Sequence, residues 1–245
     1  MRQPRLAEMV AATLRARIVD GELADGSMLP TLDGLVQEFG VSPPSIREAL
    51  RILENERLIT VKRGNVGGAV VHRPQPEGVG YMLGLVLQSQ QIRTTDLRGA
   101  LAELQPVCAA MCARRTDRRK HVVPELHAAC EGMADAIDEP HEMERWSHQF
   151  HTELIRGCGN QTLVLVVGAL EGLWASQPEA WTQRVAAADE SPDVELRKQG
   201  LLAHRRITAA VDEGDAEAAD RLMREHMGDP GIFTARRRSP VVRGT

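Results

Sequence analysis

The sequence predicts a mainly α fold in two parts: an N-terminal unit of three helices plus a β-hairpin, followed by a C-terminal all-α helical bundle. Two domains are expected because 245 residues exceed the usual size of one compact unit. Aromatic residues form only 3% of the chain, so the cores must be built from aliphatic side chains, which favours packed helices. Apolar residues also recur at helical spacing along most of the chain after residue 80.

The first 74 residues hold the pattern of three helices and a hairpin. Apolar side chains recur at helical spacing over 6–19 and 31–39, and a third helix begins after Ser42, which we expect to cap it. Residues 58–72 then follow the pattern of strand, glycine-rich turn and strand. Three short helices followed by a hairpin within about 70 residues is the layout of a winged helix-turn-helix, whose last helix enters the DNA major groove.

A break in the helical pattern separates the two domains. Residues 73–80 contain two Pro and two Gly, a composition that does not sustain a helix. We therefore end the winged helix-turn-helix domain at residue 74 and assign 75–93 to a linker and a connecting helix. Residues 94–230 are predicted to form the helical domain, and 231–245 a disordered tail. Helices are expected at about 81–90, 95–115, 119–137, 140–157, 160–177, 192–213 and 215–228.

Composition gives no support to several functions. The net charge is −4, and residues 1–75 carry ten Lys and Arg against nine Asp and Glu, so global charge does not indicate nucleic-acid binding. No apolar run reaches the roughly 20 residues of a membrane span, and the N-terminus lacks the apolar core of a signal peptide, so we expect a cytoplasmic protein without membrane contact.

The cysteines form no CxxC pair, and we expect them to be reduced and buried rather than metal-bound: Cys108, Cys112, Cys130 and Cys158.

Four short motifs in the N-terminal domain resemble the GntR family of bacterial transcription regulators. They are Asp25-Gly26-Ser27-Met28-Leu29-Pro30, Phe39-Gly40-Val41-Ser42, Ile46-Arg47-Glu48-Ala49-Leu50, and Leu53 followed by Leu58-Ile59. The resemblance spans this whole domain and implies a regulator that binds double-stranded operator DNA. It also implies that the hairpin is a wing that lies along the minor groove.

Arg47 is the strongest single candidate for a DNA contact. The resemblance places it against the operator, and an Arg one turn into the recognition helix can reach guanine O6 and N7 or a phosphate. A solvated helix arginine is the alternative. In the wing, Lys62 and Arg63 can neutralise phosphates, and the glycines let the backbone approach DNA closely. The predicted DNA-binding residues are Arg47, Ser42, Ser45, Lys62, Arg63, Gly64, Gly67 and Gly68.

Two departures from the family pattern bear on which operator is bound. The family commonly carries an Arg directly after the serine that opens the recognition helix, whereas this chain has Pro43 followed by Pro44. Another arginine common in the second helix corresponds to Asp33, whose charge would repel phosphate if it faced DNA. Proline suits the first helical turn, so the fold is not in doubt. The operator should therefore differ from those of better-matched relatives.

The second domain resembles the FadR branch of the family, whose C-terminal effector domain, the FCD domain, is a helical bundle. The motifs are Leu104-Gln105-Pro106-Val107-Cys108-Ala109, Gln149-Phe150-His151, Gly159-Asn160, Ala203-His204, Gly214-Asp215 and His226-Met227. Many members of this branch hold a divalent metal through one Asp and three His. The resemblance places His151, His204 and His226 on the histidine positions and Ser147 on the Asp position.

Zinc or nickel is the metal that such a set would bind. Neutral imidazole is a standard ligand for both ions, and three inward histidines from three helices can hold one ion with positions left open. The alternative is that three histidines so far apart in sequence form no ligand set. His148 lies one position off the helix face shared by Ser147 and His151, so we expect it to face solvent.

A small-molecule effector is the second ligand that the resemblance implies. The branch often carries an Arg at the position of Leu101, for which Arg98 is a substitute candidate. If Leu101 lines the pocket, the effector is less acidic or more apolar than the usual small hydroxy- or dicarboxylic acid. The predicted effector-binding residues are Ser147, Arg98 and Asn160.

The sequence therefore predicts a homodimeric transcription regulator, not an enzyme, whose operator affinity is set by a carboxylate-type metabolite and a divalent metal. A metal-free sensor of acyl ligands is the alternative. A helical metallohydrolase is more remote, because His141-Glu142 begins like the HExxH motif but Arg145 stands where the second His is required.

Overall fold

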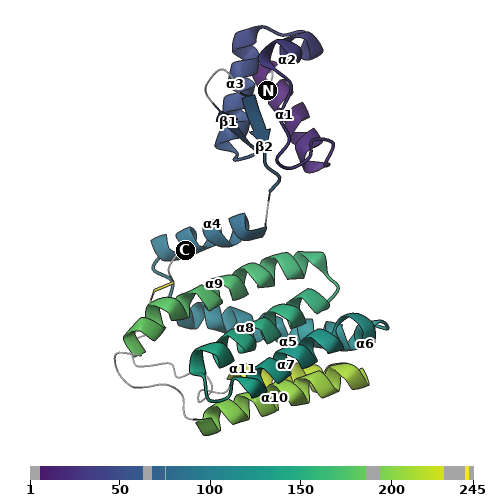
Figure 1. Cartoon of the computed structure of the whole chain (residues 1–245), viewed down its shortest axis with the longest axis vertical. Coiled ribbons are helices and arrows are strands. Elements are labelled where there is room, and N and C mark those ends of the chain that lie inside the picture. Colours follow the sequence, from purple (N-terminus) through teal and green to yellow (C-terminus); the bar gives the residue numbers. More distant parts are fainter. Residues whose placement is uncertain (1–5, 63–67, 75, 186–193, 229–240, 243–245) are drawn as a thin grey trace. The chain divides into compact units, whose positions relative to one another are not determined.

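The computed structural model describes residues 6–62, 68–74, 76–185, 194–228 and 241–242 (Figure 1). The chain divides into two compact units, residues 1–75 and 76–245, and each is described by itself. Among the described residues, no helix combines the length and the apolar character needed to cross a membrane.

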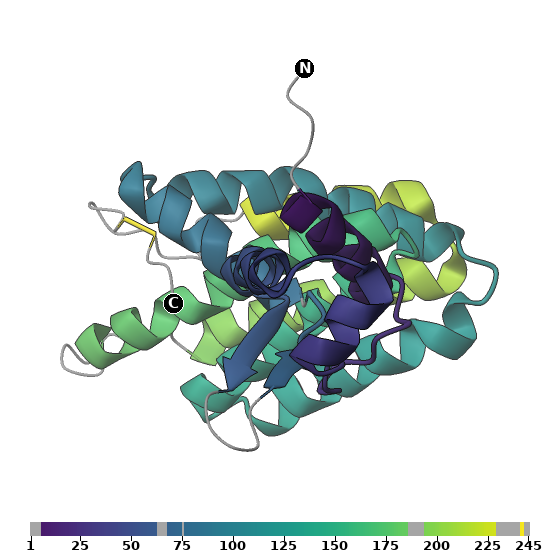
Figure 2. The same ribbon diagram turned by 90° about the horizontal axis from the view of Figure 1, so that it is seen from above.

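The N-terminal unit has three helices and a two-stranded antiparallel sheet, the architecture predicted from the sequence. The two strands lie side by side with Ile59 opposite Val71 and Lys62 opposite Gly68 (Figure 2). Residues 63–67, at the turn between them, lie outside the described residues. The elements are α1 (Leu6–Val19), α2 (Leu32–Phe39), α3 (Pro43–Asn55), β1 (Ile59–Lys62) and β2 (Gly68–Val71).

Local residue choice sets the ends of α2 and α3. The Thr31 hydroxyl accepts a hydrogen bond from the Gly34 amide at 3.2 Å, and Gly40 ends α2 in the left-handed conformation at φ 63°. Ser42 is the N-cap residue of α3, as predicted, but its hydroxyl makes no capping bond and lies 3.1 Å from the Ser45 hydroxyl. Pro44, at the second helical position, has no amide hydrogen to donate, and the Ser45 amide at the third position donates to the Ser42 carbonyl at 3.0 Å instead.

One apolar core holds this unit together. The buried stripe of α3 packs against α1, and the hairpin closes the far side through its inward-facing residues. The face of α3 that carries Arg47 is left exposed. The buried members of the core are Val10, Ala11, Leu14, Ile18, Leu29, Leu35, Ile46, Ala49, Leu53, Leu58, Ile59, Ala69 and Val71.

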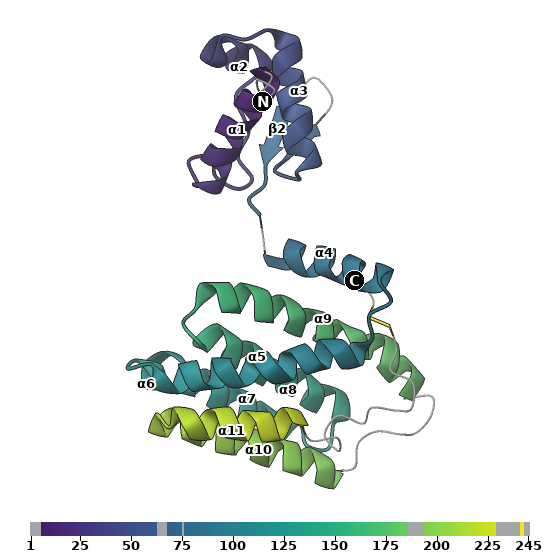
Figure 3. The same cartoon turned by 180° about the vertical axis from the view of Figure 1, so that it is seen from behind.

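The C-terminal unit is an all-α bundle arranged around one central helix. That helix, α5, contacts α8, α9, α10 and α11, and it runs across the bundle in the view from behind (Figure 3). The described helices are α4 (Pro76–Ser89), α5 (Thr94–Arg114), α6 (Arg118–His121), α7 (Val123–Asp135), α8 (Pro140–Gly157), α9 (Gln161–Val185), α10 (Val194–Glu213) and α11 (Ala216–Gly228).

The structure corrects three expectations about this unit. The segment over 73–80 was expected to be free of helix, yet α4 begins at Pro76, because proline is well suited to a first helical turn. The helix predicted over 119–137 is two helices that meet at Val122, because Pro124 has no amide hydrogen and cannot donate the backbone hydrogen bond that a continuous helix requires. The helix expected to end near residue 177 continues to Val185.

A fourth correction concerns the predicted disordered tail over 231–245. Its described residues, Val241 and Val242, pair with the chain that precedes α5: Val241 forms a bridge with Arg93, and the Val242 amide donates to the Ile92 carbonyl at 2.8 Å. The Val242 side chain is fully buried beside Leu97. The prediction is wrong for these two residues because Val242 is buried against Leu97 and Leu173. The other tail residues, 231–240 and 243–245, lie outside the described residues.

The four cysteines are free and buried, as predicted. Cys108 and Cys112 lie on the inner face of α5, and the Cys112 thiol donates to the Leu154 carbonyl at 3.1 Å. Burial and the neighbouring Cys158 sulfur raise the pKa of Cys108 to about 12, so it stays a thiol at neutral pH. These side chains act as small apolar filling between helices.

A pair of leucine truncations tests the core of the bundle. Leu126 on α7 is completely buried, whereas Leu202 on α10 is 58% exposed. We expect Leu126→Ala to lower the free energy of unfolding by about 2–5 kcal/mol, because it removes buried methyl groups and leaves a cavity. Leu202→Ala, the control, should change it by about 0.5 kcal/mol or less. Urea unfolding followed by circular dichroism measures both, and equal effects of the two changes would contradict the placement of α7.

Candidate functional site

The exposed surface of the N-terminal unit presents the predicted DNA-contacting residues that the structure describes. Arg47 lies one turn into α3 and is exposed, directly after the buried Ile46. Within the described part of the chain, its guanidinium forms no ion pair. Ser42 is exposed, and Ser45 is half-buried on the same first turn of α3. The start of α3 therefore offers a cation and two hydroxyls to a ligand.

Of the predicted DNA-contacting residues in the wing, the structure describes only Lys62 and Gly68. Lys62 is exposed at the end of β1, and Gly68 is half-buried at the start of β2. A Cβ on Gly68 would lie 2.2 Å from the Met28 methyl group, so this glycine also makes room for packing within the unit. Arg63, Gly64 and Gly67 lie outside the described residues.

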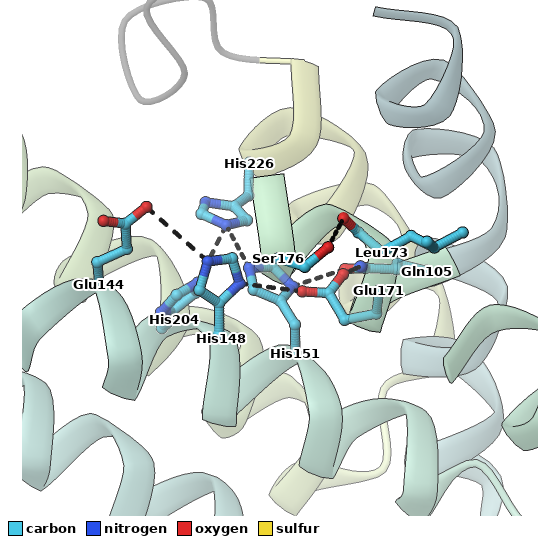
Figure 4. Close-up of polar contacts among 9 residues, drawn as sticks. All are labelled: Gln105, Glu144, His148, His151, Glu171, Leu173, Ser176, His204 and His226. Carbon is cyan, nitrogen blue, oxygen red and sulfur yellow. Dashed lines mark hydrogen bonds and ion pairs between the residues drawn. The ribbon is translucent and has the colours of Figure 1, made fainter. Parts of the chain in front are cut away.

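Three histidines meet inside the bundle (Figure 4). His151 comes from α8, His204 from α10 and His226 from α11, and all three side chains are buried. The Nε2 atom of His226 lies 3.0 Å from that of His204 and 3.3 Å from that of His151. One potential ligand atom from each residue lies within 4.8 Å of the others. The structure therefore brings together residues that are separated by up to 75 positions in the chain.

Hydrogen bonds on the far side of two rings set where their protons lie. The Nδ1 atom of His151 is 2.6 Å from the Gln105 Oε1 atom, a carbonyl oxygen that can only accept, so Nδ1 carries the proton. The Nδ1 atom of His204 is 3.0 Å from the Met133 sulfur, a weak acceptor, which favours a proton there as well. Both rings then direct an Nε2 lone pair toward His226.

Burial keeps two of these rings neutral. It lowers the pKa of His151 and of His204 well below the ordinary value, and the positive charge that His226 would carry lowers both further. His204 is also stacked on Phe150, with ring centres 4.0 Å apart. Neutral rings with fixed orientation are the form in which imidazole binds metals.

The spacing of the nitrogens fits a transition-metal ion. An ion that holds imidazole nitrogens at about 2.0–2.1 Å keeps them roughly 3.0–3.4 Å from one another, depending on coordination geometry. Two of the three separations, those from His226 Nε2 to His204 Nε2 (3.0 Å) and to His151 Nε2 (3.3 Å), fall in that range, and one ligand atom from each residue lies within 4.8 Å of the others. The chemistry of the set, three neutral imidazoles, matches zinc or nickel better than magnesium or calcium, which prefer oxygen.

A small cavity of about 30 Å³ opens beside the cluster, with room for about two water molecules. Ser147 lies one helical turn before His151 on α8 and lines this cavity, as expected of a site residue. Ser147 stands at the sequence position where the family resemblance led us to expect an Asp. The residues that line the cavity are Gln105, Ser147, His148, His151, Glu171, Trp174 and Met227.

His148 does not face solvent, contrary to the prediction. Its side chain is 21% exposed, and its Nδ1 atom lies 3.2 Å from a carboxylate oxygen of the buried Glu171. Burial by itself would lower the pKa of His148, but hydrogen bonds and charge from Glu144 and Glu171 outweigh it and raise that pKa to about 9. The prediction failed because it considered only the face of α8, whereas α9 covers the next position as well.

Three other candidates lie away from the cavity. The Arg98 guanidinium donates to the Met227 carbonyl at 2.8 Å near the end of α11, which is a structural use. Asn160 is exposed and caps α9, accepting from the Thr162 and Leu163 amides at 3.0 and 3.1 Å, so its side chain is not directed at an effector. Leu101 is buried in the core and does not line the cavity.

Sequence reasoning missed Glu171 and Trp174. Glu171 is the only charged residue in the apolar stretch 161–177, and a lone carboxylate in such a stretch is a signal that was available. Trp174 lies one turn further along α9 and carried no comparable signal. Both reach the cavity only because α9 packs on α8.

Comparison with known families assigns both units. Residues 6–70 match bacterial regulatory proteins of the gntR family, and residues 96–229, more than half of the chain, match the FCD domain. The structure is similar to that of Streptococcus agalactiae GntR, with a TM-score of 0.66 and 21% identity, over 91% of this chain and 97% of that one. At 21% identity, this similarity shows a shared fold only.

Curated relatives are transcription regulators. The Escherichia coli (strain K12) HTH-type transcriptional repressor GlaR is 28% identical over 78% of each chain. The HTH-type transcriptional repressor NanR of Salmonella schwarzengrund is 26% identical over 91% of this chain and 82% of its own. The regulator Mce2R of Mycobacterium tuberculosis is 24% identical over 89% and 87%.

The neutral buried histidines predict how stability depends on pH. His151 and His204 keep their folded pKa below the value of about 6.5 that an unfolded chain gives histidine, so below that pH only the unfolded state gains these protons. We expect the metal-free protein to lose up to about 1.4 kcal/mol per histidine for each pH unit between 6.5 and 5.5. His148, with its raised pKa, contributes stability that is present below pH 6.5 and lost as pH rises through 9.

Urea unfolding in the presence of a chelator, at pH 7.0, 6.5, 6.0 and 5.5, measures this dependence. His121→Asn provides the control, because it removes an exposed histidine that lies outside the buried cluster. A free energy of unfolding that stays constant over this interval would mean that the buried rings take up protons in the folded state.

Proposed function

The chain belongs to the gntR family of bacterial regulatory proteins and carries an FCD domain, and from this premise we propose a repressor whose operator affinity is controlled by a small carboxylate-type metabolite and a divalent metal. DNA binding and regulation follow from the family, and no enzymatic activity is expected from it. The metal, the effector and the dimer are the parts that we add. The observation that carries the metal site is the convergence of the Nε2 atoms of His151, His204 and His226 within the FCD domain.

The exposed start of α3 supports operator recognition by Arg47. An arginine at this position of a recognition helix can bind guanine O6 and N7 at once, and Ser42 and Ser45 beside it can bind phosphate oxygens. Lys62, together with Arg63 and the glycines of the wing, would meet the adjoining backbone. Asp33 on α2 is exposed, so operator sequences that bring phosphate close to it would be disfavoured.

The metal would be held by His151, His204 and His226. When bound, the ion supplies a positive charge and open coordination positions that an effector carboxylate can occupy. The protein holds the three rings buried, with His151 and His204 neutral and oriented by Gln105 and Met133. Ser147 would lie beside the open positions as a neutral hydrogen-bonding group.

The effector would enter the cavity beside the cluster, where Ser147, His148 and Gln105 offer polar contacts. A cavity of about 30 Å³ is smaller than a metabolite of several heavy atoms, so binding must displace lining side chains such as Trp174. Trp174 belongs to α9, which packs against α4, and α4 follows directly on the N-terminal unit. Effector binding can thereby bias the segment that joins the two units.

We propose a homodimer because a palindromic operator requires two recognition helices related by a twofold axis. A metal-free sensor of acyl ligands is the second candidate function. The specific observation in its favour is Ser147, which removes the acidic ligand expected on α8. The two proposals differ in the metal content of the protein.

Arg47→Ala should weaken binding to the specific operator by about 1–3 kcal/mol, because it removes a side chain that reads a base. Arg51→Ala is the matched control: it removes an exposed arginine one turn later on α3, which pairs with Glu48. Fluorescence anisotropy at fixed salt, with DNA from the chain's own promoter region and with random DNA, measures both. Equal losses for the two variants, or unchanged affinity for Arg47→Ala, would remove Arg47 from the site.

Metal content tests the histidine site. After incubation with zinc or nickel and removal of free ion, the wild-type protein should hold about one ion per chain, since one set of three imidazoles is available. His204→Asn should hold much less than one, while His127→Asn, a change on the exposed side of α7, should match the wild type. Elemental analysis by mass spectrometry gives the ratio. A wild-type protein that retains no ion would favour the metal-free sensor.

A further inference from the structure

Glu171 is a buried carboxylate close to the histidine cluster that the proposed function has not used. Its side chain is 4% exposed, and it lies on α9, a helix that carries none of the three histidines. We propose that Glu171, acting through Gln105, positions His151 for a divalent cation and supplies the negative charge that Ser147 lacks. This inference rests on the proposed metal site and names a positioning residue for it.

Two short hydrogen bonds connect Glu171 to His151. The Gln105 amide nitrogen, Nε2, donates to Glu171 Oε2 at 2.7 Å, and the Gln105 oxygen, Oε1, accepts from His151 Nδ1 at 2.6 Å. All three side chains are buried, so bulk solvent does not compete for these bonds. The second Glu171 oxygen, Oε1, accepts from His148 Nδ1 at 3.2 Å, which holds the carboxylate in place (Figure 4).

The direction of each bond follows from the chemistry of Glu171. A carboxylate can only accept hydrogen bonds, so the amide nitrogen of Gln105 must face it and the amide oxygen must face His151. That oxygen can only accept, so the proton of His151 lies on Nδ1 and the lone pair on Nε2. Without the carboxylate, the Gln105 amide could turn and donate to Nδ1, which would place the proton of His151 on Nε2, inside the cluster. A ring in that form cannot bind a cation through Nε2.

The charge of Glu171 serves the same site. Three neutral imidazoles leave both charges of a divalent ion uncompensated, and Ser147 contributes no negative charge. A carboxylate hydrogen-bonded to the partner of a ligating histidine makes that histidine a stronger ligand. An acid at residue 147 on α8 would have bound the ion directly. Glu171, on the neighbouring helix α9, would instead act on the ion through the side chains of Gln105 and His151.

Glu144 provides the contrast. It is another carboxylate beside His148, with its Oε1 atom 3.9 Å from His148 Nε2. Its side chain is 37% exposed, and it takes no part in the hydrogen bonds that join Glu171, Gln105 and His151. Removal of Glu144 therefore takes away one charge near His148 and leaves that link intact.

The test compares Glu171→Gln, Glu144→Gln and the exchange variant Gln105→Glu/Glu171→Gln, all in the full chain. In the exchange variant, the new carboxylate on α5 accepts from His151 and from the new amide on α9, so both the charge and the direction of the hydrogen bond to His151 are kept. Zinc affinity is measured by competition with a chelating dye. We expect it to fall about 10–100-fold in Glu171→Gln, and to stay close to the wild-type value in Glu144→Gln and in the exchange variant.

A second readout needs no metal. Long-range 1H–15N spectra of the histidine rings in the metal-free protein report which nitrogen carries each proton. We expect His151 to be protonated on Nδ1 in the wild type and in the exchange variant, and to populate the Nε2–H form in Glu171→Gln. Should Glu171→Gln fail to fold, the exchange variant carries the test, since loss of zinc affinity or of the Nδ1–H form there would overturn the proposal.

The outcomes separate this inference from the proposed function. If the wild type binds no zinc while the tautomer of His151 still depends on Glu171, the metal site fails and the positioning role stands. If the wild type binds zinc and Glu171→Gln matches it in affinity and in tautomer, the metal site stands and the role of Glu171 is overturned. An equal loss of affinity in Glu144→Gln would reduce Glu171 to a general source of charge and overturn its action through Gln105.

Discussion

The convergence of three imidazole nitrogens in a buried space constrains the whole bundle. His151 and His204 each direct an Nε2 lone pair at His226, and the Nε2 atom of His226 can donate a proton to only one of them. The lone pair of the other ring then receives no proton from His226, and a cation among the three nitrogens would bind it. Burial lowers the pKa of His151 and of His204 and so keeps both rings neutral. The proposed cation site therefore depends on helices α8, α10 and α11, which carry the three histidines, keeping their positions relative to one another.

The small residues of α5 make this register possible. Cys108, Ala109, Cys112 and Ala113 are almost completely buried, and they allow the neighbouring helices to approach α5 closely. At the far end of α8 a Cβ on Gly157 would lie 2.8 Å from Val122 and 3.2 Å from the Cys112 sulfur. Helix α5 also carries Gln105, so it both sets the spacing of the bundle and orients His151. A low aromatic content and four buried thiols are the compositional consequences of this close packing.

The sequence was sufficient for features that depend on local pattern or on family motifs. The helix over 6–19 has the predicted bounds, the hairpin follows α3, and the three histidines meet although they come from separate helices. Features that depend on contacts between helices far apart in the chain could not be predicted from the sequence. Glu171 reaches the site only because α9 lies on α8, and the same contact buries His148. Val242 packs against Leu97 and Leu173, a contact that no local pattern in the tail predicts.

The central claim, that His151, His204 and His226 together hold one divalent cation, is tested most directly by X-ray absorption at the zinc edge of the zinc-loaded protein. The account predicts about three imidazole nitrogens at about 2.0–2.1 Å, with any remaining ligands being oxygen. Sulfur ligands at about 2.3 Å would contradict it, because the ion would then be bound by the buried cysteines. A shell of oxygen without imidazole would contradict it equally.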